Sequence, residues 1–303
     1  ARPQAALSCG HYCIGMALAA LSGEVKLAWR LLQPRSQAPG GALRRPLLLI
    51  HGFGCGMGDW GALPQLLADR GAREVAVFDH RGVGQSDVPC APYHVADLVR
   101  DAESVLDAAD WSRAHVLGIS MGGMVAQNLA MELPHRVSGL VLGCTTHGGR
   151  LAVPPPAEFI AACQSWKDSD TAAQRHFAET FLDFNLPENW TSLPGGSRLR
   201  SQMLDRFLET TRSEEGLAGQ FAALSRFNSL KALEQIQAPT LVVHGDEDKV
   251  VPPPNGESLA SRIPKAQYLP WNAAGHFWWV VKPLEAVEKV GEFLDACDES
   301  IEH

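Results

Sequence analysis

The sequence predicts an α/β protein in which a mostly parallel central sheet is flanked by helices and interrupted by one helical insertion. Three observations predict this class. Strand-like and helix-like segments alternate between residues 46 and 144, the strand-like runs are continuously apolar, and residues 147–237 have only helical periodicity. Continuously apolar runs are typical of strands buried on both faces, which are the strands of a parallel sheet.

The composition limits the function classes. The chain has 303 residues, of which 46% are hydrophobic and 20% charged, with a formal net charge of -8 and no basic stripe. These values are typical of an ordinary globular protein, and they disfavour a nucleic-acid partner. No run of 18 apolar residues is present in the sequence, so we expect no membrane-spanning segment. No feature of the sequence indicates an oligomeric state.

The cysteines and the N-terminal segment bear on location. The seven cysteines are irregularly spaced, which favours free thiols in a reducing compartment, either the cytoplasm or an organelle lumen. Residues 1–23 have no acidic side chain and are rich in alanine, so we expect an N-terminal extension or a targeting segment. His11 and Tyr12 interrupt its apolar stretch, which argues against a signal peptide.

The core elements are expected on both sides of the insertion, in residues 24–146 and 238–303. Proline and glycine punctuate the segments, and apolar residues recur at helical spacing between the strands, for example at Trp60, Leu63 and Leu67. Strands are expected over residues 24–32, 46–50, 74–78, 114–120, 137–145 and 239–245, and helices over 59–70, 95–110, 121–133 and 280–296.

The insertion, residues 147–237, differs in residue pattern from the rest of the chain. It lacks strand-like runs and is rich in large aromatic residues, such as Phe177, Phe181 and Phe207. Because it separates two halves of one predicted sheet, its position predicts a helical lid rather than an independent domain.

A serine between glycines, in the run Gly118-Ile119-Ser120-Met121-Gly122, follows a predicted strand and begins a predicted helix. Ser120 can be a helix N-cap or a nucleophile at a sharp turn. A sharp turn needs very small residues two positions before and after the serine, because larger side chains would collide with the strand and the helix. It also places the Met121 N–H at a helix N-terminus, where partial positive charge accumulates.

A second glycine-flanked loop, His51-Gly52-Phe53-Gly54, follows an earlier predicted strand. Its backbone N–H groups would face the same point as the Met121 N–H. Phe53 and Met121 are therefore the candidate donors of an oxyanion hole. We expect His51 to be a structural hydrogen-bonding residue rather than a base.

Two later loops supply the partners that a nucleophilic serine requires. The run "HGDEDKVVP" offers three candidate acids, Asp246, Glu247 and Asp248, and the run "AAGHF" offers His276. A serine needs a base to accept its proton, and the base needs a carboxylate that fixes its tautomer. The chain order serine, acid, histidine is that of hydrolases with a G-x-S-x-G turn.

Taken together, five motifs resemble those of the α/β-hydrolase family, which includes esterases, lipases, enol-lactonases and carbon–carbon bond hydrolases. The resemblance covers about residues 24–296. It rests on "HGFG", "FDHRGVGQSD", "GISMGG", "GDEDKVVP" and "AGHF".

This resemblance implies the α/β-hydrolase fold and assigns roles to individual residues. Alignment of the acid loop on Gly245 and Pro252 implies that Asp248 is the acid of the triad. Asp79 and Arg81 of the "FDHRG" turn are then structural. Relatives that hydrolyse epoxides or remove halogens resemble one another in having aspartate at the nucleophile position, so Ser120 disfavours those two activities.

The sequence therefore predicts a serine hydrolase that cleaves an ester-type bond (a carboxylester, lipid ester or lactone) of a small to medium apolar substrate through an acyl-enzyme. Trp278, His147 and Phe159 are the candidate substrate-binding residues. No metal, flavin or nucleotide signature is present, so no cofactor and no metal is expected. The alternatives are a carbon–carbon bond hydrolase or a cofactor-free perhydrolase with the same triad, and a ligand sensor on this fold.

Overall fold

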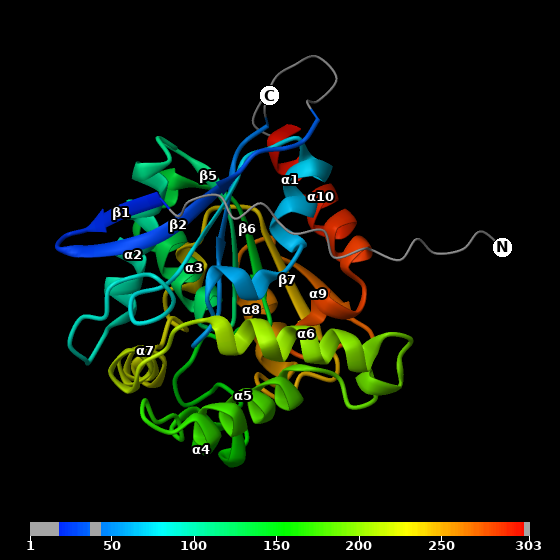
Figure 1. Ribbon diagram of the computed structural model, residues 1–303. Coiled ribbons are helices and arrows are strands. Elements are labelled where there is room, and N and C mark those ends of the chain that lie inside the picture. Colours follow the sequence, from blue (N-terminus) through cyan, green and yellow to red (C-terminus); the bar gives the residue numbers. More distant parts are fainter. Residues whose placement is uncertain (1–17, 37–43, 300–303) are drawn as a thin grey trace.

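An eight-stranded sheet with the order β1-β2-β4-β3-β5-β6-β7-β8 lies at the centre of the protein (Figure 1). The computed structural model describes residues 18–36 and 44–299. The strands are β1 Leu18–Ser22, β2 Val25–Leu32, β3 Leu47–Ile50, β4 Val75–Phe78, β5 Ala114–Ile119, β6 Val137–Gly143, β7 Thr240–Gly245 and β8 Gln267–Trp271.

Strands β3 to β8 are parallel, and β1 and β2 pair antiparallel at one edge. Every residue of β3 to β7 is buried, since helices cover both faces of the sheet. The predicted mostly parallel sheet is thus confirmed.

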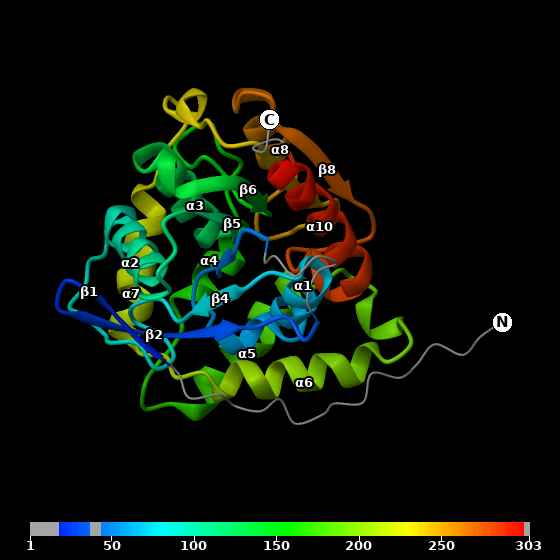
Figure 2. The same ribbon diagram turned by 90° about the horizontal axis from the view of Figure 1, so that it is seen from above.

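The core helices cover the two faces unequally. Helices α2, α3 and α8 lie on one face, and α1 and α10 lie on the other, where they contact each other (Figure 2). The core helices are α1 Leu63–Gly71, α2 Val95–Ala108, α3 Met121–Glu132, α8 Pro254–Arg262, α9 Trp278–Val281 and α10 Pro283–Glu299.

Two predicted helices have different bounds, and one helix was not expected. The predicted 59–70 helix begins only at Leu63, because a short 3-10 turn, Met57–Trp60, precedes it. The predicted 280–296 helix is divided before Pro283, which lacks a backbone N–H and begins α10. Helix α8 begins at the last of three consecutive prolines, Pro254, and has no clear apolar period in the sequence.

Strand β1 corrects the expectation for the N-terminal segment. Its residues, Leu18–Ser22, fall within the 1–23 extension, yet they pair with β2 through a two-residue turn in which Gly23 has a φ of 63°. The strand consists of leucine, alanine and serine, without the β-branched or aromatic residues that indicate strands in a sequence. Residues 1–17 of the predicted extension lie outside the described residues.

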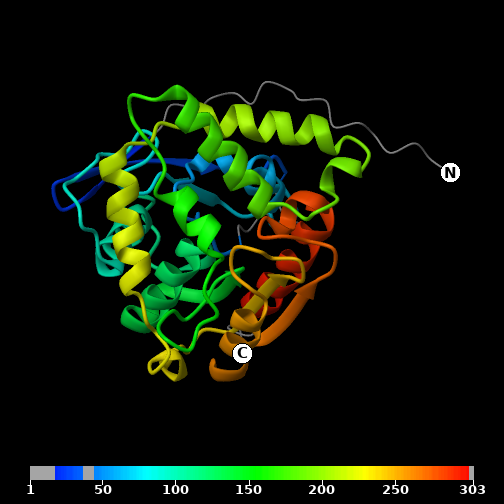
Figure 3. The same ribbon diagram turned by 90° about the horizontal axis from the view of Figure 1, so that it is seen from below.

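The insertion between β6 and β7 is helical, and its helices lie together at one end of the sheet (Figures 1 and 3). They pack around aromatic rings of their own, among them Phe177, Phe181 and Phe207. The limits 147–237 stay a prediction. Within them lie α4 Ala157–Cys163, α5 Thr171–Asn185, the 3-10 turn η3 Trp190–Ser192, α6 Gly196–Glu209 and α7 Glu214–Arg226.

Among the described residues, no helix is both long enough and apolar enough to cross a bilayer.

Candidate active site

Ser120 occupies a sharp turn between the buried strand β5 and helix α3. Its backbone has φ 53° and ψ −122°, a conformation that L-residues rarely adopt and that the surrounding structure must hold in place. The Ser120 N–H donates to Gly143 O at 3.0 Å, and Ser120 O accepts from Thr145 Oγ1 at 2.6 Å. The Ser120 side chain does not cap the helix, which disfavours the N-cap interpretation.

The glycines around Ser120 are required by close backbone packing. A Cβ at Gly122 would lie 2.0 Å from Ile50 O, and a Cβ at Gly118 would lie 2.2 Å from Gly122 O. At Gly52, in the neighbouring loop, a Cβ would lie 3.1 Å from the Ser120 Cβ. The strand β3, the loop after it and the serine turn therefore pack against one another without room for side chains.

The loop from Gly52 to Cys55, here called the oxyanion loop, places amide groups beside Ser120. Three of its four N–H groups have acceptors: Gly52 N–H donates to His51 Nδ1, Gly54 N–H to Gln220 Oε1, and Cys55 N–H to Gly52 O. Within the described residues, the N–H groups of Phe53 and Met121 have no hydrogen-bond partner. They are the two donors that the sequence predicts, and their role stays a prediction.

His51 supports the loop and is a poor base. It is fully buried, its Nδ1 accepts the Gly52 N–H at 2.7 Å, and its ring lies 4.2 Å from that of Trp60. Burial lowers the pKa of His51 well below its usual value, and the charges of His80 and His276 lower it further. The imidazole is therefore neutral, in keeping with a structural role.

His276 and Asp248 form a buried pair. His276 Nδ1 lies 2.8 Å from Asp248 Oδ2, and Asp248 Oδ1 accepts the N–H groups of Val250 and Val251 at 2.8 and 2.9 Å. Of the three candidate acids, the structure brings only Asp248 to His276. Asp246 and Glu247 are exposed, and Asp246 accepts the Ala274 N–H instead.

The environment of Asp248 keeps it ionised. Burial raises the pKa of its carboxyl, but the charge of His276 and hydrogen bonds from His244 and His276 outweigh this effect. The net result is a pKa well below the usual value for aspartate. A buried carboxylate in contact with Nδ1 fixes the His276 tautomer, which leaves Nε2 for proton transfer.

Cys144 is buried beside this pair. The Cys144 sulfur and the nearest ligand atoms of Asp248 and His276 lie within 4.8 Å of one another. Burial raises the pKa of the Cys144 thiol well above its usual value, and the charge of Asp248 raises it further. Asp248 Oδ2 is already occupied by His276.

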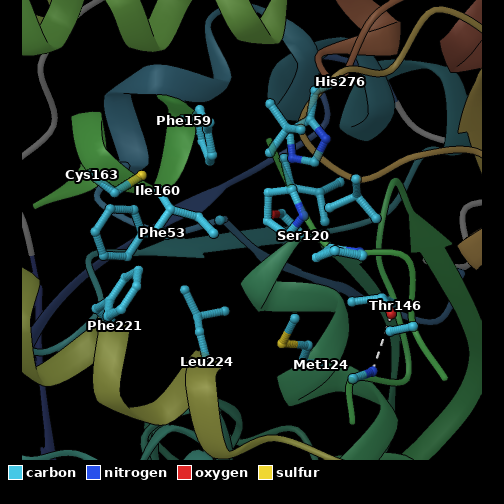
Figure 4. Close-up of a pocket in the computed structure, with 18 of the residues that line it drawn as sticks. Phe53, Ser120, Met124, Thr146, Phe159, Ile160, Cys163, Phe221, Leu224 and His276 are labelled. Atoms are coloured by element: carbon cyan, nitrogen blue, oxygen red, sulfur yellow. Dashed lines mark hydrogen bonds between the residues drawn. The ribbon is translucent and has the colours of Figure 1, made fainter. Parts of the chain in front are cut away.

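A cavity of about 330 Å³ lies between the core and the insertion, with Ser120 and His276 in its wall (Figure 4). Figure 4 shows Phe53, Phe221, Cys163 and Ile160 gathered on one side of Ser120. The lining is mainly apolar, and among the described residues that form it there is no lysine, arginine, aspartate or glutamate.

The structure places the three predicted substrate-binding residues differently. Phe159 lines the cavity, whereas the described lining does not include Trp278 or His147. Trp278 is fully buried against Trp271 and Trp279, and Phe277 takes the place in the cavity wall that the sequence suggested for a tryptophan. His147 bonds Gly148 O and Ser258 Oγ.

Several lining residues were not predicted as contacts. Those from the insertion, such as Phe221 and Leu224 of α7, stand at helical spacing. In the sequence that spacing identifies a buried face but not the surface that it meets.

A family model described as the alpha/beta hydrolase fold matches residues 45–283. The chain belongs to the α/β-hydrolase family. The resemblance inferred from the five sequence motifs is confirmed, and so is the fold that it implied.

Individual relatives are hydrolases. A poly(3-hydroxyalkanoate) depolymerase from Ectopseudomonas oleovorans is 32% identical over 258 residues, 84% of this chain and 86% of the relative. A 2-hydroxymuconate semialdehyde hydrolase from Pseudomonas sp. (strain CF600) is 30% identical over 264 residues, 84% of this chain and 88% of the relative.

The solved structures agree in fold. An enol-lactonase from Burkholderia xenovorans LB400 superposes with a TM-score of 0.78 at 22% identity, covering 92% of this chain and all of that one. At this identity the likeness concerns the fold alone. The protein is thus a hydrolase of the α/β-hydrolase fold.

Proposed function

We propose that the protein is a serine hydrolase that cleaves an ester-type bond through an acyl-enzyme, with Ser120, His276 and Asp248 as its triad. One observation carries the proposal. Ser120, with its strained backbone, lines the same cavity as His276. The Nδ1 of His276 is bonded to the buried, ionised Asp248.

The proposed reaction follows from these positions. His276 Nε2 accepts the Ser120 proton while Oγ attacks the carbonyl carbon of the ester. The N–H groups of Phe53 and Met121 stabilise the oxyanion that forms. His276 then protonates the leaving alcohol, and in the second half it activates a water molecule that releases the acid. The two half-reactions together convert one ester and one water molecule into one acid and one alcohol.

The cavity favours a neutral, apolar acyl group. A charged group without a partner is costly to bury, and the described lining offers apolar side chains and no formal charge outside the triad. A volume of about 330 Å³ is near the lower end for ligand pockets, which suits a small or medium substrate. The relative named as a poly(3-hydroxyalkanoate) depolymerase supports ester chemistry, since polyhydroxyalkanoates are polyesters. We propose that residues 147–237 act as a lid over this cavity.

Carbon–carbon bond hydrolysis is the second candidate, because one relative is named a 2-hydroxymuconate semialdehyde hydrolase. A substrate of that kind carries a carboxylate. The described cavity lining contains no cation that would pair with it. This is why we rank ester hydrolysis first.

The test is covalent labelling with a fluorophosphonate probe, together with hydrolysis of p-nitrophenyl esters from acetate to palmitate. We expect labelling and hydrolysis by the wild type and their loss in Ser120→Ala. Ser104→Ala is the control, since Ser104 lies on α2 and is not among the described residues that line the cavity, and it should keep both. Labelling that persists in Ser120→Ala would refute the proposal, and a folded wild type that is not labelled would favour a ligand sensor.

A further inference from the structure

We propose that two buried side chains of the insertion, Arg212 and Gln220, position the oxyanion loop of the core and so complete the oxyanion hole. The inference rests on the proposed function, because it concerns the donor that Phe53 would supply. Arg212 and Gln220 would be positioning residues, since neither lines the cavity as described.

Both backbone groups of Gly54, the residue after Phe53, are bound by the insertion. Gly54 N–H donates to Gln220 Oε1 at 2.9 Å, and Gly54 O accepts from Arg212 Nε at 2.6 Å. Gln220 is fully buried on α7, and its Nε2 donates to Arg81 O at 2.9 Å. Gln220 thus joins two loops of the core that follow different strands.

The oxyanion loop needs this support because its own bonding is sparse. Gly54 has a φ of 66°, and a glycine has wide conformational freedom. The only hydrogen bond that closes the loop on itself, among the described residues, is the 3.3 Å contact from Cys55 N–H to Gly52 O. Phe53 N–H lies between Gly52 and Gly54, so its direction depends on how firmly these neighbours are held.

Arg212 is itself immobilised, which makes it a rigid donor. Its side chain is fully buried, and its Nη1 donates to the carbonyl oxygens of Thr210, at 2.8 Å, and Phe207. The guanidinium lies 3.6 Å from the centre of the Phe207 ring, and its Nη2 lies 3.4 Å from Asp59 Oδ2. Asp59 in turn accepts the Gly56 N–H, just beyond the oxyanion loop, at 2.8 Å.

These contacts imply that the insertion does more than cover the cavity. Polar side chains from two of its segments, Arg212 between α6 and α7 and Gln220 on α7, both end on the backbone of Gly54, the residue after Phe53. A shift of about 1 Å in a catalytic group reduces turnover by about 100-fold. The oxyanion hole is therefore complete only while both segments are docked on the core.

The experiment compares an ester with the thionoester of the same acyl group in wild type and Gln220→Met. Sulfur is a weaker acceptor than oxygen, so thionoester turnover depends less on the oxyanion hole. We expect kcat for the ester to fall about 10- to 100-fold with little change in KM. Thionoester turnover should fall much less, so the ester-to-thionoester rate ratio should drop at least about 10-fold.

Gln127→Met is the matched control. Gln127 is also fully buried and also joins the core to the insertion, since its Oε1 accepts from Ser229 Oγ at 2.7 Å, while its Nε2 donates to Thr146 O of the core at 3.1 Å. Neither bond involves the oxyanion loop. Its ester-to-thionoester ratio should equal that of the wild type even if its stability falls. An equal ratio in folded Gln220→Met would overturn the inference.

If Gln220→Met does not fold, Arg212→Lys tests the same inference. A lysine amine cannot donate to Gly54 O and to the carbonyls of Phe207 and Thr210 with the geometry of a guanidinium. The ester-to-thionoester ratio should again fall, and a ratio equal to that of the wild type would overturn the inference. Labelling of Ser120 is measured in parallel, so that failure of the proposed serine mechanism is distinguished from failure of this inference alone.

Discussion

The core and the insertion contribute to the candidate site by different means. In the core, Ser120, Asp248 and His276 each lie in the loop after a buried or partly buried parallel strand, β5, β7 and β8. In the insertion, the contributing side chains stand on helices and on the segments between them, and their positions depend on which side chains of the core they meet. Phe159 and Phe221 contribute apolar wall, while Gln220 reaches the backbone of the oxyanion loop.

This difference shows that the positions of the candidate catalytic residues are set by the sheet, whereas the walls that the insertion adds to the cavity are set by how the insertion packs on the core. Carboxyl ends of neighbouring parallel strands meet at one edge of a sheet, so residues distant in the sequence are brought together by the fold itself. The insertion is not part of the sheet, so the order of strands does not place its side chains. Its docking relies on aromatic packing and on a few buried polar contacts, and core and insertion should therefore respond differently to substitution.

The largest effect should come from the acid in the core. Asp248→Asn should lower kcat by about 10⁴-fold, since the amide no longer holds the productive tautomer of His276. Asp246→Asn, two residues away, should stay within a few-fold of the wild type, because Asp246 is exposed and bonds Ala274 N–H. Steady-state kinetics on a p-nitrophenyl ester measures both. The reverse order would mean that the wrong carboxylate has been assigned to His276.

Substitution of a tightly packed glycine in the core should have the next largest effect. Gly122→Ala adds a Cβ that would lie 2.0 Å from Ile50 O, so the serine turn must shift, and turnover should fall by about 100-fold or more. Gly58→Ala is the control, since the nearest atom to its added Cβ, Arg206 Cγ, is 4.0 Å away. Kinetics and thermal denaturation of both variants check this. Full activity in Gly122→Ala would show that the turn is less tightly packed than described.

A pH series tests the electrostatics of the core triad. The pKa of Asp248 is below its unfolded value, so its ionised form stabilises the folded state above the usual aspartate pKa of about 4. That contribution is lost as the pH falls from about 4 toward the lowered pKa. The Tm difference between wild type and Asp248→Asn should therefore be largest near neutral pH and shrink below about pH 4. A difference that grows on acidification would contradict the lowered pKa.

The smallest effect should arise in the insertion, away from the cavity. Asp170 caps helix α5, and its Oδ1 accepts the N–H groups of Ala172 and Ala173 at 2.9 and 3.0 Å. Asp170→Ala should cost about 1 kcal/mol of the free energy of unfolding, with kcat unchanged. Urea denaturation measures the loss, and Ser169→Ala, an exposed neighbour, is the control. A large fall in kcat for Asp170→Ala would show that the insertion is coupled to the chemistry well beyond Arg212 and Gln220.

More of the core than of the insertion is predictable from the sequence, for a physical reason. Buried strands appear as short apolar runs, and the glycines around Ser120 are local requirements of a tight turn, so both can be recognised without knowing the partners. Strand β1 was missed because Leu18–Ser22 has no strand-like composition and is stabilised by pairing with β2. Residue patterns alone left three candidate acids, because Asp246, Glu247 and Asp248 differ only in the direction in which the loop turns them.

The sequence by itself determined the fold class, the serine turn and the order of serine, acid and histidine, since each depends on short-range steric and hydrophobic patterns. Only the tertiary structure decided that Phe277 and not Trp278 faces the cavity, and that Gln220 bonds Gly54. Gln220 and Gly54 are 166 residues apart. Contacts of that kind depend on how the insertion packs on the core, and no local pattern of residues encodes them.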